Sequence, residues 1–136
     1  MRTIVNRMQK TRQRLRARPS ILVVEKENDV RELILEMLAG QGFEVSSAEG
    51  GLSALELARK EKKVDLLLTE TEPRGMRASE LTRLLYKAHP KVKILFMSGK
   101  FDEGFAYMLG DQAERLFLLK PFTRQTLLAK IEGILS

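Results

Sequence analysis

Residues 21–27 read Ile-Leu-Val-Val-Glu-Lys-Glu, a run of four apolar residues that stops abruptly at three charged ones. An uninterrupted apolar run, largely β-branched, is typical of a strand that is covered on both faces. The next segment has apolar residues at helical spacing as far as Gly40, and Asn28 or Asp29 is expected to cap that helix. The apolar residues of its predicted inner face are Val30, Leu33, Ile34, Met37 and Leu38.

The same unit, a strand followed by a helix, recurs five times along the chain. Further strands are expected at 43–47, 64–69, 92–97 and 116–119, and further helices at 52–58, 79–89, 103–109 and from Thr123 onward. Such alternation implies right-handed crossovers and a parallel sheet with helices on both faces. The predicted fold is therefore α/β, a five-stranded doubly wound parallel sheet of strand order 2-1-3-4-5, flavodoxin-like (βα)5.

Positive charge is concentrated at the amino terminus. Residues 1–20 contain seven Lys or Arg and no acid, whereas the rest of the chain has 17 basic and 18 acidic residues. We therefore divide the chain into a basic arm, 1–19, flexible or helical, and a domain, 20–136. In a helical arm an apolar stripe suited to pairing or docking would be formed by Ile4, Met8, Thr11 and Leu15. Specific DNA reading is not expected, since no aromatic residue interleaves the arginines.

Composition excludes several other classes of protein. The chain has no cysteine, which rules out disulfides and thiolate metal sites and fits a reducing compartment. No apolar run approaches the roughly 18 residues that a membrane-spanning helix needs. We therefore expect a cytoplasmic protein without a membrane span.

Polar side chains follow directly after four of the predicted strands. The carboxyl ends of parallel strands share one edge of the sheet, where ligands bind in doubly wound folds. Two acids, two lysines and a hydroxyl are expected to converge there, namely Glu25, Lys26, Glu70, Ser98 and Lys120.

Five segments match one known family in order and spacing. They are Ile21–Glu27, Asp65–Glu70, Gly75–Met76, Phe96–Gly99 and Leu119–Phe122. Over about residues 20–136 the chain resembles the receiver (response regulator) domain of two-component systems, and is especially similar to receivers attached to hybrid histidine kinases. In that family, two adjacent acids after the first strand and an aspartate after the third hold Mg²⁺, and the aspartate takes a phosphoryl group from a histidine kinase.

The resemblance places altered residues at the acidic positions. Glu25 and Lys26 stand where the family has its adjacent acids, and Glu70 stands at the phosphoacceptor aspartate. A one-residue slip in the loop that follows would put Thr69 at the acceptor instead. Neither alignment places an aspartate there, so we expect a degenerate phosphoacceptor site.

Two other family positions are unchanged. The resemblance implies that Ser98 is the hydroxyl and Lys120 the lysine that bind phosphoryl oxygens, with Lys120–Pro121 a candidate cis peptide bond. Phe117 falls at the aromatic switch of the fifth strand, although an apolar side chain on a buried strand also serves as plain core.

Charge balance argues against a metal ion. Glu25 and Glu70 are matched by Lys26 and Lys120, so the site is neutral without Mg²⁺. We expect no cofactor; Glu25 and Glu70 would be the ligands if Mg²⁺ does bind. Two roles for Glu70 stay open: pairing with Lys120 or Ser98 in a permanently active-like state, or forming a neutral structural pair with Lys26.

Our leading interpretation is an atypical receiver, not an enzyme, that acts as a phosphorylation-independent protein-binding signalling module. Its partner, or a second copy forming a homodimer, would contact the face made by the helix at 103–109, the strand at 116–119 and the last helix. Two alternatives remain. The first is a working phosphoacceptor that uses Mg²⁺ and a histidine-kinase donor, and the second is nucleic-acid binding through the phosphate contacts of the basic arm.

Overall fold

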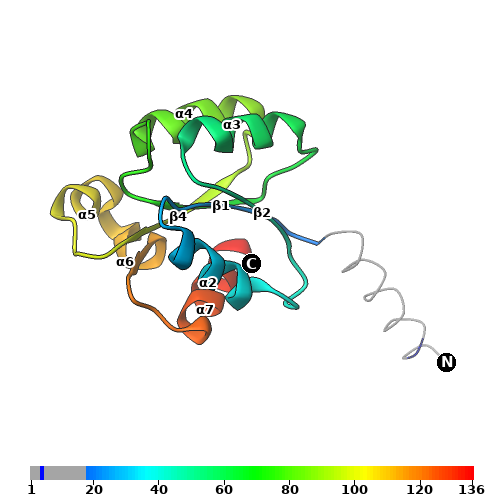
Figure 1. The fold of residues 1–136 in the computed structure, drawn as a ribbon. Coiled ribbons are helices and arrows are strands. Elements are labelled where there is room, and N and C mark those ends of the chain that lie inside the picture. The colour runs from blue at the N-terminus through cyan, green and yellow to red at the C-terminus, as the bar shows by residue number, and fades with distance from the viewer. Residues whose placement is uncertain (1–3, 5–17) are drawn as a thin grey trace.

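The computed structural model describes residue 4 and residues 18–136 (Figure 1). Most of the predicted basic arm therefore lies outside the described residues, as do Met8, Thr11 and Leu15 of its expected stripe. Among the helices of the described part, none is long and apolar enough to cross a membrane.

Five parallel strands form one sheet in the order β2-β1-β3-β4-β5, which confirms the predicted doubly wound α/β fold. The strands are β1 Ser20–Val24, β2 Glu44–Ala48, β3 Leu66–Glu70, β4 Lys93–Ser98 and β5 Phe117–Leu119. The helices are α2 Asn28–Leu38, α3 Gly51–Lys60, α4 Ala78–Ala88, α5 Glu103–Leu109, α6 Ala113–Leu116 and α7 Arg124–Leu135, with a 3-10 turn η1 at Gly110–Gln112.

Helices cover both faces of the sheet, as the uninterrupted apolar strands require. Figure 1 shows α3 and α4 on one face and α2 and α7 on the other, with α5 and α6 towards one side. The first layer packs through Ala54, Leu55, Ala58, Leu81 and Leu85. The second layer packs through Ile34, Leu38, Leu127, Ile131 and Ile134. The central strand β3 serves both layers, because Leu67 faces the first layer while Leu66 and Leu68 face the second.

The start of α2 differs from the prediction. Its N-cap is Glu27, without a side-chain cap, so the expected capping by Asn28 or Asp29 is wrong. The Asn28 side chain instead accepts a hydrogen bond from Arg31 Nη2 at 2.6 Å. Leu33, expected on the inner face, is 51% exposed, because one residue turns the helix by about 100° and Ile34 takes the inward position.

The other differences are small. β3 begins at Leu66 and not at Val64, and the connection from α5 to β5 contains η1 and α6, which were not predicted. The predicted cap of the last helix is confirmed, because Thr123 Oγ1 accepts a hydrogen bond from the Thr126 amide at 3.1 Å.

The central strand should dominate stability. We expect Leu68→Ala to lower the free energy of unfolding by about 2–5 kcal/mol, because it leaves a cavity in a fully buried layer. Leu52→Ala is the matched control, since Leu52 is 67% exposed and its truncation should cost less than about 0.5 kcal/mol. Urea unfolding of the two variants measures both values, and equal costs would contradict this description of the core.

Candidate functional site

Strand register brings the predicted site residues to one edge of the sheet. Val24 pairs with Thr69, so Glu25 and Glu70 leave β1 and β3 side by side. Ser98 pairs with Leu119 at the ends of β4 and β5, and the Lys120 amide donates to the Ser98 carbonyl at 2.7 Å. The convergence expected from the strand ends is therefore present.

Glu25 is the most deeply buried charged residue of the site and has no solvent exposure. Its Oε1 accepts a hydrogen bond from the Lys120 ammonium, and its Oε2 accepts one from the Glu27 amide at 3.3 Å. The Glu25 carbonyl accepts from Arg31 Nη1 at 2.9 Å, which fixes the turn into α2. A buried carboxylate is tolerated here because a cation and backbone donors compensate its lost hydration.

Glu70 is paired differently from Glu25. Its Oε2 accepts a hydrogen bond from the Lys26 amide at 3.0 Å, and its Oε1 lies 3.6 Å from Lys26 Nζ. The Lys26 side chain is partly exposed, so its ammonium sits at the mouth of the site. Pairing of Glu70 with Lys120 is wrong, because Lys120 is held by Glu25; the geometry agrees with the alternative pair, Glu70 with Lys26.

The two carboxyl groups influence each other's ionisation. Burial raises the pKa of Glu70 to about 7, and the hydrogen bond with Glu25 and its negative charge act in the same direction. Burial also opposes ionisation of Glu25, but hydrogen bonds from Glu70 and Lys120 and the positive charge of Lys120 outweigh it, so its pKa lies below 4.5. Near neutral pH a proton is therefore shared within the pair and resides mainly on Glu70.

The surroundings of Glu70 also disfavour its charged form. Glu70 Oε1 is buried without a hydrogen-bond partner among the described residues, so a negative charge there is poorly compensated. Protonation of Glu70 removes its repulsion with the Glu25 carboxylate. The net charge of the four side chains then lies between zero and +1, and not at zero as charge balance predicted.

This set of donors does not fit Mg²⁺. The ion requires near-octahedral oxygen ligation, but each carboxyl already has an ammonium group within 4.0 Å. Within the described chain, no group of three acidic, histidine or cysteine side chains is arranged to hold a metal. A site with no net negative charge also lacks the electrostatic attraction that a divalent cation needs.

The remaining predicted positions lie at or near this edge. Ser98 ends β4, and its hydroxyl accepts from the Lys100 amide at 3.4 Å; no hydrogen bond joins it to Glu70 among the described residues. Thr69 is fully buried and its hydroxyl donates to the Glu70 carbonyl at 3.0 Å, so it is Glu70 that lies beside Lys26. The Lys120–Pro121 bond is cis, as predicted. Phe117 is partly buried and packs on the first layer and on the ring of Phe101.

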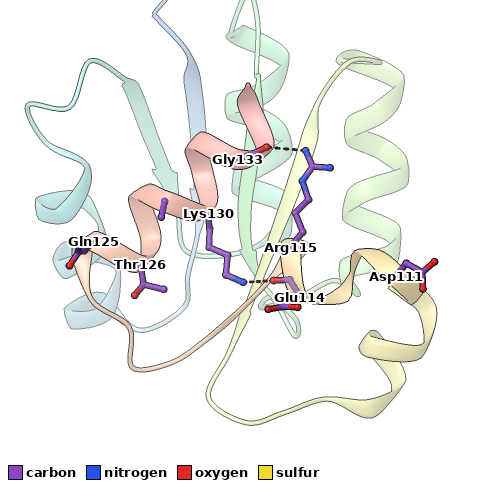
Figure 2. A pocket seen from close by; sticks show the side chains of 8 residues that line it. Asp111, Glu114, Arg115, Gln125, Thr126, Lys130 and Gly133 are labelled. Atoms are coloured by element: carbon purple, nitrogen blue, oxygen red, sulfur yellow. Dashed lines mark hydrogen bonds between the residues drawn. The ribbon is translucent and has the colours of Figure 1, made fainter.

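Sequence reasoning missed one residue that positions the site. Arg31 lies in the first turn of α2 and fixes the Glu25 carbonyl by donating to it. In the sequence, Arg31 is distinguished only as a basic residue near the start of a helix. A separate hollow between α6 and α7 contains none of the site residues; there Arg115 donates to the Gly133 carbonyl and Lys130 to the Glu114 carbonyl (Figure 2).

Comparison with known proteins finds a family model and several relatives that match this chain. The family described as "Response regulator receiver domain" matches residues 21–132. The sensor kinase CckA of Brucella abortus is 32% identical over 118 residues, which are 86% of this chain but only 12% of that protein. The response regulator receiver protein CpdR of the same organism is 30% identical over 85% of this chain and 95% of its own length. The chain spans 51% of the transcriptional regulatory protein CreB of Escherichia coli, at 26% identity.

Solved structures share the fold. The chemotaxis protein CheY4 of Vibrio cholerae superposes with a TM-score of 0.75 at 22% identity, over 88% of this chain and all of that one. A response regulator receiver protein of Sinorhizobium medicae gives 0.74 at 21% identity, over 88% of this chain and 95% of its own.

The shared proton makes stability depend on pH. Folding raises the pKa of Glu70 from 4.5 to about 7, so protonated Glu70 stabilises the folded state. This contribution to the free energy of unfolding is complete below about pH 4.5 and is lost as the pH rises through about 7. The lost contribution is up to roughly 3 kcal/mol. Glu70→Gln should remove this fall, because its amide still accepts from Lys26 and donates to Glu25. The free energy of unfolding, measured by urea at pH 5, 6, 7 and 8, should fall in the wild type and stay flatter in the variant.

Glu27→Gln is the control for this experiment, since Glu27 is an exposed neighbour outside the carboxyl pair. Its profile should follow that of the wild type. Parallel profiles for wild type and Glu70→Gln would contradict the shared proton.

Proposed function

This chain belongs to the response regulator receiver domain family, and we propose that it is a receiver that signals by binding a protein partner without being phosphorylated. The observation that carries the proposal is the Lys26 ammonium, 3.6 Å from the carboxyl of Glu70 at the acceptor position. On this proposal the ammonium of Lys26 takes the place of the metal ion that a receiver of the usual kind holds.

Phosphoryl transfer requires that the reacting groups are positioned and that the charge developing on the phosphoryl group is neutralised. Receivers use a metal ion for this neutralisation. Both requirements are compromised here. Glu70 is one methylene longer than the aspartate of the family, its Oε2 accepts a hydrogen bond from the Lys26 amide, and burial favours its protonated form. We therefore assign the chain no catalytic residue.

A protein partner is supported by the surface at α5, β5 and α7, which we call the α5–β5–α7 face. Phe101, Tyr107 and Leu119 are exposed there, Tyr107 to 91%. A hollow of about 620 Å³ on this face is lined largely by apolar residues, among them Phe117 and Phe122. Contiguous apolar surface rimmed by polar groups marks binding sites for proteins. We propose that this face binds a cytoplasmic signalling protein, and that the abundance of the chain sets the output.

Phosphorylation can be tested directly. We expect no added phosphoryl group on the wild type after incubation with acetyl phosphate and Mg²⁺, read by intact mass. Lys26→Asp/Glu70→Asp should gain a Mg²⁺-dependent phosphoryl group, because it restores both the acceptor and the acidic position beside Glu25. Glu70→Asp alone should stay unmodified, since Lys26 still opposes the metal.

The double variant without Mg²⁺ serves as the control and should remain unmodified. A phosphoryl group on wild-type Glu70 would refute the proposal and favour the phosphoacceptor alternative. Phosphorylation of Glu70→Asp to the same extent as the double variant would show that Lys26 is not the cause.

A further inference from the structure

A groove lies on the first-layer side of the molecule, away from the carboxyl-edge site. It has a volume of about 520 Å³ and is bounded by the end of α4, the start of β4, and the segment from α5 to α6. None of the four paired site residues lines it. Its walls combine apolar and basic side chains, which include Tyr86, Lys91, Lys93, Ile94, Met108 and Arg115.

The charge of this groove has one sign. Lys91, Lys93 and Arg115 line it, and no carboxylate from the described part of the chain does. Among the described residues, none of these three cations has a carboxylate oxygen within 4.0 Å. Arg115 is nevertheless fixed, because it donates to Gln112 Oε1 at 3.3 Å. It also donates to the Gly133 carbonyl at 3.0 Å, as Figure 2 shows. Its guanidinium has five donor hydrogens, so it retains capacity for a carboxylate.

The floor of the groove is apolar. Tyr86 and Met108 are among the exposed large side chains of the domain, and Ile94 and Phe96 lie buried beside them. A nucleic acid would place its phosphodiester groups against the cations but would leave this apolar surface exposed to water. The groove therefore suits a protein segment in which apolar side chains alternate with carboxylates.

The outer face of α2 has this composition. Asp29, Glu32, Leu33 and Glu36 fall at i, i+3, i+4 and i+7, which places them on one side of the helix. All four are exposed, and none of the three carboxylates is in an ion pair among the described residues. Arg31, the one basic residue of α2, is engaged by the Glu25 carbonyl and the Asn28 side chain.

We propose that the groove binds the outer face of α2 from a second copy of this chain, with Leu33 on the apolar floor and its acidic neighbours against the basic rim. α2 and α4 cover opposite faces of the sheet, so a molecule cannot place its own α2 in its own groove (Figure 1). In a head-to-tail pair one copy keeps a free α2 and the other keeps a free groove, so further copies can be added. The basic arm is excluded as occupant, because its charge has the same sign as that of the groove.

Self-association measured by sedimentation velocity on the full chain tests this proposal. The wild type should form larger species as concentration rises, and added salt should weaken them because the rim charges are exposed and screened. Glu32→Lys/Glu36→Lys and Lys91→Glu/Lys93→Glu should each raise the dissociation constant at least roughly tenfold. All four positions are exposed, so both variants should retain the wild-type circular dichroism spectrum and melting temperature.

Mixing the variants gives the decisive comparison. The first variant keeps a basic groove and the second keeps an acidic α2, so an equimolar mixture should associate although each variant alone does not. A chain with all four reversals should also regain association. Lys60→Glu/Lys62→Glu, on exposed residues at the end of α3, is the matched control and should behave as the wild type.

Three results would overturn the proposal. They are a wild type that stays monomeric at millimolar concentration, loss of association in only one of the two variants, and no recovery in the mixture. Sedimentation does not report on phosphorylation, so a result against self-association would leave the proposed phosphorylation-independent function unaffected. Likewise, phosphorylation of Glu70 would refute that function without bearing on self-association.

Discussion

The arrangement of the site follows from the burial of one carboxylate. Glu25 leaves β1 without solvent exposure, so its charge must be compensated inside the protein. Lys120, 95 residues later and just after β5, supplies the cation. Because Lys120 is engaged in this way, Lys26 is the only cationic partner of Glu70 among the described residues. The negative charge of Glu25 disfavours a second negative charge on Glu70. The raised pKa of Glu70 is thus a consequence of how Glu25 is held.

Replacing one acid by a lysine changes the chemistry of the whole edge. A receiver that holds Mg²⁺ needs an excess of carboxylate, whereas these four side chains carry a net charge between zero and +1. Lys26 contributes a positive charge and also fills part of the site, because its backbone amide and its ammonium both contact Glu70. Substitution of the acceptor alone would have left the two adjacent acids after β1 in place. Here both carboxyl groups instead lie in internal ion pairs, Glu25 with Lys120 and Glu70 with Lys26.

Two outer surfaces carry the interactions that we propose for this domain. The α5–β5–α7 face presents exposed aromatic and aliphatic side chains and suits a protein partner. The basic groove and the acidic face of α2 have complementary composition but lie on different sides of the domain. We propose that these surfaces, which cannot meet within one molecule, bind between molecules. Neither proposed contact involves Glu70.

The sequence by itself determined the fold and the membership of the site. Apolar strands alternating with amphipathic helices predict a doubly wound parallel sheet. The strands of such a sheet end at one edge, where Glu25, Glu70 and Lys120 meet. The sequence left open which lysine pairs with which carboxylate, and it misplaced Leu33 and the cap of α2. Those outcomes depend on angles, burial and distances between segments far apart in the chain. Only the tertiary structure decided them, because ionisation and pairing respond to the whole surrounding environment and not to neighbours in sequence.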